Sequence, residues 1–235
     1  MLRKYLSLLF LAILTALQSS FAPLQALRLG SSGPSPAALP AGNVPIPAPS
    51  AADFKRDGSL ESLQLQDGRL AILSAGRMVW QSPAGWTVAQ AAITDLNQDG
   101  KPEATLLVWR PFRAWPVDQW LPHGGRIAGF QDAVGDSCQI ILIGWRGQAY
   151  GELWAGSPMA EPVRSFAVAD LAGEPGQALI TLEGRYADDR AAPAHALKVW
   201  KWNGFGFTIV YAIKGTFVKM VPVQARDGRI LILYP

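Results

Sequence analysis

Cysteine is almost absent from the sequence, and this absence already narrows the class of fold. One of the 235 residues is a cysteine, Cys138, so an intramolecular disulfide is excluded. It lies in the apolar run SCQIILIGW, which predicts a buried small hydrophobic residue. The fold therefore depends on packing and, where the sequence offers ligands, on a metal ion.

Histidine is also scarce, and the usual catalytic motifs are missing. The two histidines, His123 and His195, lie far apart in the sequence and match no metal-ligand spacing. The sequence contains no G-x-S-x-G, no phosphate-binding glycine loop and no cluster of His and Cys. We therefore expect no catalytic residue and no residue that binds an organic cofactor. These absences favour a binding protein over an enzyme.

Concentrated positive charge is missing as well. The 21 Lys and Arg and the 18 Asp and Glu give a formal net charge of +3, and no Lys/Arg run occurs. Nucleic-acid binding needs a concentrated basic face, so we expect no nucleic-acid partner. Sustained 3.6-residue periodicity is absent after residue 28, which predicts a fold almost without helix.

Glycine, proline and tryptophan are, in contrast, abundant, with 23, 18 and 9 copies. Gly and Pro mark tight turns, and Trp covers sheet faces. Apolar runs separated by turns such as DGRL and WNGFG predict short strands joined by hairpins. We expect an all-β domain with more than about a third of its residues in strands. The hairpin tryptophans expected mainly on buried sheet positions are Trp80, Trp109, Trp145, Trp154 and Trp200.

The N-terminal segment, residues 1–28, has the order of a secretory leader. Basic residues precede the uncharged stretch 6–17, which is shorter than the roughly 20 residues of a membrane span. A cleaved signal peptide is therefore favoured over an uncleaved anchor. Residues 29–52, rich in Pro, Ala and Ser, are expected to form a linker, and residues 53–235 the folded domain. We expect a secreted or cell-envelope protein that contacts a membrane only if the leader stays uncleaved.

The most informative stretch is residues 91–109, AAITDLNQDGKPEATLLVW. Two β-favouring runs flank a loop with oxygen-bearing side chains at its positions 1, 3, 5 and 9. Ca²⁺ binds six to eight oxygens, and a loop that bends at Gly100 can direct these side chains and a carbonyl toward one ion. The calcium ligands that this spacing predicts are Asp95, Asn97, Asp99, the carbonyl of Lys101, and Glu103.

This loop resembles the D-x-[DN]-x-D-G-x-x-[DE] loop of FG-GAP or VCBS repeats, the units of integrin-like β-propellers. In that family the loop joins the first two strands of a four-stranded blade. The resemblance implies a β-propeller-like fold that binds calcium in blade loops. The alternative is a turn in which Asp95 and Asn97 hydrogen-bond to local amides without a metal.

Degenerate copies of the loop recur along the chain. Residues 53–61, DFKRDGSLE, align with residues 95–103 at an offset of 42 positions (from 53 to 95). Copies near Asp132, Asp170 and Asp227 keep the outline but lack the ligand set. This pattern predicts about four units of four short strands. Integrin-type rings have seven blades, and this chain is too short for seven. The alternatives are therefore a four- or five-bladed ring closed by its ends, an open array completed by a second chain, and a β-sandwich.

One segment, residues 110–126, departs from the repeat. Its sequence, RPFRAWPVDQWLPHGGR, is expected to replace the third and fourth strands of the second unit with a long loop, and such loops often carry function. Its aromatic and basic side chains could stack on a sugar or peptide and hydrogen-bond to it, unless they fold back to cap a blade. The candidate ligand-binding residues are Arg110, Arg113, Trp115, Trp120 and His123.

Three functions are compatible with the sequence. The first is an extracytoplasmic, non-enzymatic module with a structural calcium loop, which recognises a protein or a carbohydrate through blade loops. The second is an extracytoplasmic hydrolase or lyase on the same scaffold, for which His123 with Asp118 or Arg113 is the candidate cluster. The third is a structural subunit of an envelope assembly. A pocket that gathers His123 and its neighbours would favour the enzyme.

Overall fold

The chain is all-β in the part that the structure describes. This computed structural model describes residues 25–30, 33–39, 44–46, 48–114, 116, 120, 127–170, 176–224 and 230–234. These residues form seventeen strands and no α-helix, which confirms the prediction of an all-β fold. Accordingly, none of them belongs to a helix with the length and hydropathy of a membrane span.

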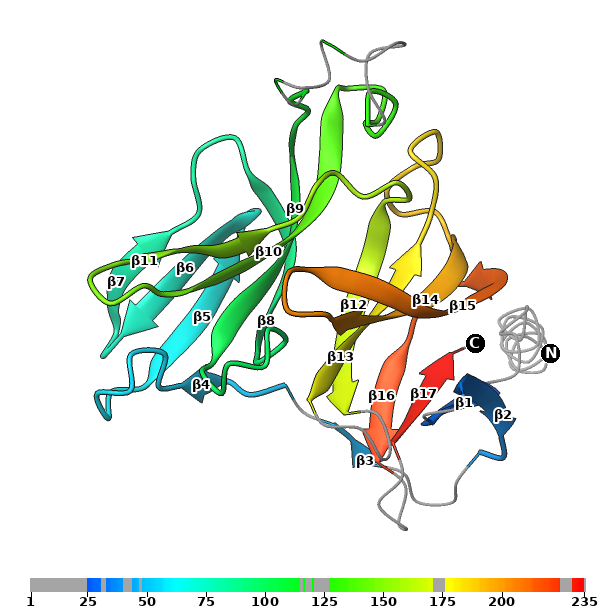
Figure 1. Ribbon diagram of the computed structural model, residues 1–235, viewed down its shortest axis with the longest axis horizontal. Coiled ribbons are helices and arrows are strands. Elements are labelled where there is room, and N and C mark those ends of the chain that lie inside the picture. Colours follow the sequence, from blue (N-terminus) through cyan, green and yellow to red (C-terminus); the bar gives the residue numbers. More distant parts are fainter. Residues whose placement is uncertain are drawn as a thin grey trace, which may run out of the picture.

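The strands form four antiparallel sheets, which are called sheets 1 to 4 below (Figure 1). Sheet 1 has the order β4-β5-β6-β7, sheet 2 β11-β10-β9-β8, sheet 3 β12-β13-β14-β15, and sheet 4 β2-β1-β17-β16-β3. The bounds are β1 Gln25–Gly30, β2 Gly33–Ala37, β3 Val44–Pro45, β4 Ala51–Ala52, β5 Glu61–Gln66, β6 Arg69–Ser74, β7 Arg77–Gln81, β8 Thr87–Thr94, β9 Glu103–Pro111, β10 Asp136–Trp145, β11 Tyr150–Ala155, β12 Val163–Asp170, β13 Gln177–Glu183, β14 Ala194–Trp202, β15 Phe207–Phe217, β16 Val221–Gln224 and β17 Ile230–Tyr234.

Each sheet packs against the next one along the chain. Sheet 2 is covered on both faces: Leu106 packs against sheet 1 beside Ile72, and Leu107 packs against sheet 3 beside Leu179. This explains why β9 and β10 read as continuous apolar runs, as strands buried on both faces do. A third cluster of buried side chains joins sheets 3 and 4.

Sheet 4 joins the two ends of the chain. β1 pairs with β17 from Gln25↔Tyr234 to Arg28↔Leu231, and β2 pairs with the other edge of β1. In Figure 1 the dark blue strands therefore lie beside the red one. Leu27 on β1 is 4% exposed and belongs to the cluster between sheets 3 and 4. The two ends of the chain thus pair, as one alternative of the sequence analysis had it, but they pair through β1, which that analysis assigned to the leader.

The folded part begins before residue 53, where the sequence analysis placed its boundary. β1 starts inside segment 1–28, and β2, β3 and β4 lie inside segment 29–52. The linker was predicted from abundant Pro and Ala, yet β2, GPSPA, is an edge strand, a position in which Pro is tolerated because one side of the strand has no ladder to satisfy. Residues 1–24 lie outside the described residues, so the leader stays a prediction.

The second unit has its third and fourth strands, contrary to expectation. β10 and β11 complete sheet 2 after segment 110–126, which is inserted between β9 and β10. The prediction that this segment replaces two strands was therefore wrong. The run SCQIILIGW was interpreted as part of a separate worn unit because an acidic loop with Asp132 precedes it. It is instead the third strand of sheet 2, buried from Ser137 to Gly144.

The tryptophans of the hairpins lie on strands, as predicted, but only one of the five occupies a buried position, where most were expected to. Trp109 on β9 is buried, with 4% of its surface exposed. The other four, Trp80, Trp145, Trp154 and Trp200, are partly buried on β7, β10, β11 and β14. The sequence pattern thus located them on the sheets, whereas the depth of burial depends on which sheet faces are covered.

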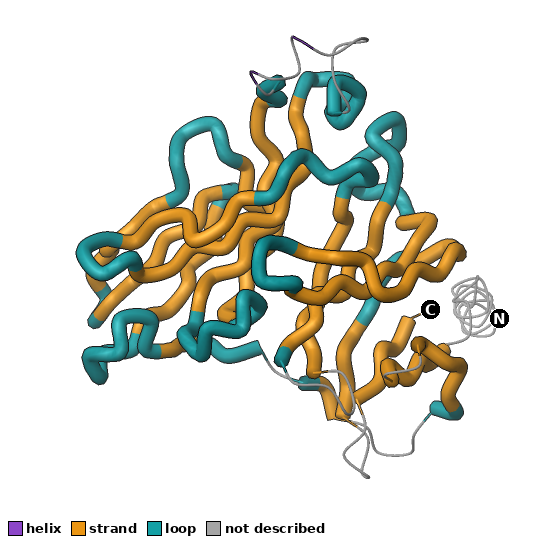
Figure 2. The backbone as a smooth tube through the Cα atoms, viewed as in Figure 1, coloured by secondary structure: helices purple, strands orange, loops and turns teal. Residues whose placement is uncertain are grey.

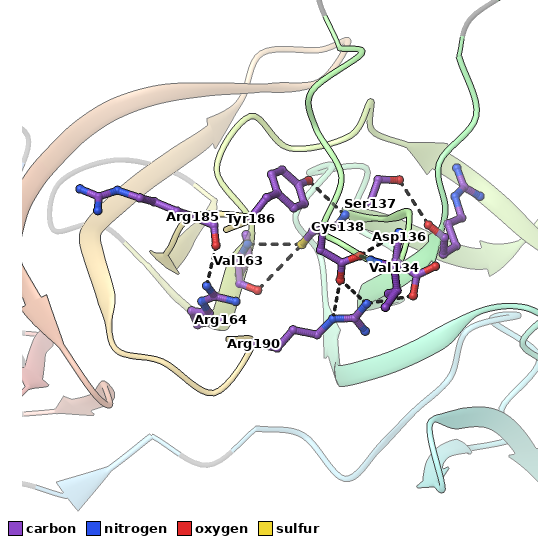
Figure 3. A network of polar contacts seen from close by, with 11 residues as sticks. Val134, Asp136, Ser137, Cys138, Val163, Arg164, Arg185, Tyr186 and Arg190 are labelled. Carbon is purple, nitrogen blue, oxygen red and sulfur yellow. Dashed lines mark hydrogen bonds and ion pairs between the residues drawn. The ribbon is translucent and has the colours of Figure 1, made fainter. Parts of the chain in front are cut away.

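A network of polar contacts links sheet 2 to the loop between β13 and β14 (Figure 3). Arg190 from this loop donates hydrogen bonds to Asp132 and Asp136 and lies 4.0 Å from the ring centre of Trp109. Cys138 Sγ accepts the Val163 N–H at 3.3 Å. Burial raises the pKa of Cys138 to about 12. This thiol is therefore a packed structural group, in line with the sequence prediction.

A second link joins sheets 2 and 3 through one side chain. The Gln90 amide nitrogen donates to the Phe166 carbonyl at 2.7 Å, and Gln90 Oε1 accepts the Phe166 N–H at 2.9 Å. Gln90 therefore bridges β8 and β12 in the manner of a strand backbone.

Replacement of Gln90 by Leu is expected to lower the free energy of unfolding by about 1–3 kcal/mol, because two partly buried backbone groups lose their partner. Urea denaturation would measure this loss. Gln64→Leu on the exposed part of β5 is the control, with an expected change below about 0.5 kcal/mol. Equal effects of the two substitutions would contradict the bridging role.

Candidate functional site

The loop between β8 and β9 is shaped by its own acidic and amide side chains. Asn97 Oδ1 accepts the Asp99 N–H at 3.1 Å, and Asp99 Oδ1 accepts the Lys101 N–H at 2.8 Å. Asp95 Oδ2 accepts the Gly100 N–H at 3.1 Å. Gly100 has a φ of 75°, a conformation that glycine adopts without steric cost. The sharp bend predicted at this glycine is present.

Three carboxylates of this loop converge. Asp95, Asp99 and Glu103 each offer an oxygen, and these oxygens lie within 4.8 Å of one another. Glu103 is fully buried, and its Oε1 accepts hydrogen bonds from Thr94 Oγ1 at 2.8 Å and from the Leu96 N–H at 2.6 Å. The second oxygen of Glu103 and Oδ1 of Asp95 are buried without a partner among the described residues. A buried ionised oxygen without a partner is costly, so these atoms are suited to contact a cation.

The raised pKa values of two carboxylates in this loop also indicate a place for a cation. Burial raises the pKa of Glu103 to about 7, and the charges of Asp95 and Asp99 add to this rise. Burial and the charge of Asp99 also raise the pKa of Asp95. A proton and a cation therefore compete for the same carboxylates.

The first loop, residues 53–60, has the same geometry as the second. Three of its hydrogen bonds repeat those of the second loop 42 positions earlier (from 53 to 95): Phe54 N–H to Glu61 at 3.0 Å, Gly58 N–H to Asp53 at 2.7 Å, and Ser59 N–H to Asp57 at 2.9 Å. Arg56 and Gln98, also 42 positions apart, share a φ of 58°. The two loops are therefore copies of one unit in structure as well as in sequence.

The first loop carries a cation of its own. Lys55 stands where the second loop has Asn97, and its Nζ lies 2.9 Å from Asp57 Oδ2 and 3.2 Å from Glu61 Oε1. These two carboxylates correspond to the last two acidic residues of the second loop. Among the described residues, no ion pair neutralises the carboxylates of the second loop. The first loop thus contains the ammonium of a lysine side chain beside its acids, whereas the second loop has the acids without such a group.

The second loop is held from both sides. Arg56 of the first loop donates a hydrogen bond to the carbonyl of Gly100. On the other side, the Asp95 N–H donates to Gln177 Oε1 of β13 at 2.8 Å. The loops before β5 and β9 lie along the same edge of the molecule, the lower one in Figure 2. The carboxylates of the second loop are therefore positioned by three sheets.

The candidate residues of segment 110–126 are only partly placed. Trp115 and His123 lie outside the described residues, as does Asp118, so the structure does not test the cluster proposed for an enzyme. Trp120 is 80% exposed. Its position is compatible with a surface contact and rules out a role of this side chain in capping a blade.

Two candidate residues of the segment meet in a cavity of about 420 Å³. Arg110 and Arg113 line it together with Trp86 and Gln139. The sequence analysis did not find the last two, because Trp86 precedes β8 and Gln139 lies on β10, both outside segment 110–126, and no motif marks them. A signal for Gln139 existed, since it is the one amide within a strand whose following residues, 140–143, are all apolar.

The second histidine belongs to a group of acidic and basic side chains on and beside sheet 3 that contact one another. His195 Nε2 lies 3.2 Å from Glu161 Oε1, and Lys198 Nζ lies 2.6 Å from Glu161 Oε2 and 2.7 Å from Glu183 Oε2. Glu183 is 1% exposed and accepts a further hydrogen bond from Trp200. Each acid in this group has a partner, as expected of a structural ion-pair network.

Comparison with protein-family models and with characterised proteins finds no match for this chain. The resemblance to FG-GAP and VCBS repeats therefore rests on the loop motif and its copies. Function has to be inferred from the geometry of the site.

Proposed function

We propose that the chain is an extracytoplasmic, non-enzymatic binding module of propeller-like blades, in which one calcium ion stabilises the loop between β8 and β9. The observation that carries the metal is the comparison of the two loop copies. Lys55 supplies positive charge to the first loop, and the second loop presents the same acids with a neutral residue, Asn97, in its place. A bound cation would neutralise the carboxylates of the second loop, as the ammonium of Lys55 neutralises those of the first.

Calcium is the cation that suits these ligands best. The loop offers carboxylate and amide oxygens from Asp95, Asn97, Asp99 and Glu103, with the carbonyl of Lys101 as a further ligand. Hard oxygen ligands in a flexible loop suit Ca²⁺, whereas Mg²⁺ requires near-ideal octahedral geometry and Zn²⁺ prefers nitrogen and sulfur. Extracellular calcium modules bind with dissociation constants of about 10⁻⁴–10⁻³ M, which agrees with the leader-like sequence at the N-terminus.

The propeller-like arrangement is supported by the order of the sheets. In sheets 1, 2 and 3 the strands follow the chain order, and each sheet packs on its successor. Sheet 4 combines strands from both chain ends, as expected of an array that is completed by joining its termini. Such a scaffold leaves its loops free to recognise a protein or a carbohydrate.

The experiment that tests the metal site transfers the tethered cation from one loop to the other. The wild-type protein should gain about 2.7 kcal/mol of stability when calcium exceeds its dissociation constant about 100-fold. The variant Asn97→Lys should lose this response, because its ammonium takes the place of the ion. Differential scanning fluorimetry with calcium and with chelator would measure both.

Gln148→Lys is the matched control, because it adds the same charge at an exposed position of the β10–β11 turn. It should keep the full calcium response. A wild-type protein whose melting temperature ignores calcium, or an Asn97→Lys variant that responds like the control, would contradict the proposed site.

A further inference from the structure

One cavity, with a volume of about 420 Å³, lies on the face of sheet 2 that packs against sheet 1. Along this face the side chains change from apolar to polar. Val108 on β9 and Ile141 on β10 belong to the core between the two sheets. Two positions away on each strand, alternation places Arg110 and Gln139 on the same face, where they line the cavity. β9 begins at Glu103 and reaches Arg110 about 23 Å further along, so the cavity is remote from the metal site.

The cavity carries positive charge. Arg110 and Arg113 line it, and neither makes an ion pair with another described residue. The guanidinium of Arg110 lies 5.3 Å from the ring centre of Trp86. Burial lowers the pKa of Arg110, the charge of Glu152 offsets part of this effect, and the charge of Arg113 adds to it. An anionic ligand would relieve the repulsion between the two guanidiniums, and a carboxylate has two oxygens with which to accept from both.

The cavity also contains a hydrogen-bond acceptor that has no donor. Gln139 is 4% exposed, and its amide nitrogen reaches Ser137 Oγ at 3.4 Å. Its Oε1 is buried without a partner among the described residues. Buried polar atoms are nearly always hydrogen-bonded, so this oxygen is suited to accept an O–H or N–H from a ligand. The ligand that fits therefore combines a carboxylate with a hydrogen-bond donor close to it.

The walls of the cavity favour a polar ligand over an apolar one. They include three prolines, Pro83, Pro111 and Pro158, beside small residues. Trp86 is 9% exposed and offers a ligand little aromatic surface. A sugar ring that bears a carboxylate and neighbouring hydroxyls needs no large apolar pocket, and the volume lies within the roughly 300–1,000 Å³ of small-molecule sites.

Other carboxylates fit less well. A fatty acid has no donor for Gln139 and requires an apolar channel. The C-terminus of a peptide has a suitable N–H, but a large last side chain would need a pocket of its own. The aromatic cavity beside Trp154 and Trp200 cannot serve, because it lies on the opposite face of sheet 2, against sheet 3.

We propose that this cavity binds a uronic acid residue of an acidic carbohydrate. The carboxylate of the sugar contacts Arg110 and Arg113, and a ring hydroxyl donates to Gln139 Oε1. The inference deepens the binding function proposed above, since it names the class of ligand, and it rests on that function.

The charge contact is tested with the full chain in isothermal titration calorimetry. The probes are trigalacturonate and a hyaluronan tetrasaccharide, whose uronic acids differ in the orientation of O4, and the methyl esters of both. At least one acid should bind, at least about tenfold more tightly than its ester, since the ester loses charge-assisted hydrogen bonds. Arg113→Gln should weaken binding of the acid about tenfold and leave the ester unchanged. Arg146→Gln, which removes the same charge from an exposed turn, should behave like the wild type.

The hydroxyl contact is tested by Gln139→Met, which keeps the length of the side chain but removes the acceptor. Binding of the acid should weaken about fivefold to tenfold. The melting temperature should not fall, because the substitution removes a buried oxygen that has no partner. A variant that binds as tightly as the wild type would contradict this contact.

Equal affinity for acid and ester, or no binding of either acidic oligosaccharide at millimolar concentration, would overturn the inference. Binding of the peptide acetyl-Ala-Ser-Ala-Phe in their place, lost in Arg113→Gln, would also overturn it but would leave the proposed binding function intact. None of these results bears on the calcium response.

Discussion

Replacement of Leu27 by Ala should lower the free energy of unfolding by about 2–5 kcal/mol, as removal of buried leucine side chains does. Leu27 is 4% exposed on β1 and belongs to the cluster that includes Ile232 and Phe217. If β1 is an integral strand of sheet 4, the substitution leaves a cavity in the core between sheet 3 and sheet 4. The loss is therefore larger than for a residue of a leader or linker.

Urea denaturation followed by tryptophan fluorescence would measure the loss. Leu39→Ala is the control, because Leu39 follows β2 closely in the chain and is 50% exposed. Its change should stay below about 0.5 kcal/mol. If Leu27→Ala is as mild as the control, the N-terminal strands contribute little to the fold, and the chain ends do not complete sheet 4.

The stability of the metal-free protein should fall by about 3 kcal/mol between pH 4.5 and 7. Glu103 has a pKa raised from its ordinary value of 4.5 to about 7, and each pKa unit corresponds to about 1.4 kcal/mol. In this range the folded protein holds a proton that the unfolded chain has released, so rising pH favours unfolding. Above pH 7 both states have lost it, and this contribution becomes constant.

Saturating calcium should reverse the trend, because the ion binds the ionised carboxylates and stabilises the folded state most at high pH. Chemical denaturation at intervals of pH, with chelator and with calcium, would measure both profiles. Glu103→Gln is the matched control, since its amide keeps the shape and an acceptor oxygen but cannot titrate. A profile of the wild type that matches this variant would show that Glu103 is not the group responsible.

The strands and the acidic loop between β8 and β9 could be predicted because their signals are local. Turn residues, alternation and apolar runs depend on neighbours in the sequence, and the spacing of Asp95, Asp99 and Glu103 places three carboxylates on one bend regardless of the rest of the fold. The match between the first and second loops was also visible in the sequence, down to Asp53 and Glu61. The role of Lys55 was not, because only the fold shows that its ammonium reaches the acids.

The elements that prediction missed depend on distant partners. β1 and β2 resemble a leader and a linker because β1 becomes a strand by pairing with the distant β17, and β2 by pairing with β1. The assignment of β10 to sheet 2 likewise depends on pairing across the long insertion. Trp86 and Gln139 become parts of a cavity only after β8, β9 and β10 pair.

The composition of sheet 4 determines when the protein can finish folding. The hydroxyl of Tyr234 donates a hydrogen bond to Gln25 across a separation of 209 residues. Contacts of such separation form slowly, because nearly the whole chain must be closed into a loop before they are made. During synthesis β1 and β2 can pair with each other, but the other edge of β1 stays unpaired until β17 has emerged from the ribosome. Sheet 4 can therefore be completed only after β17 has been synthesised, and a chain truncated before residue 230 leaves β1 paired with β2 alone.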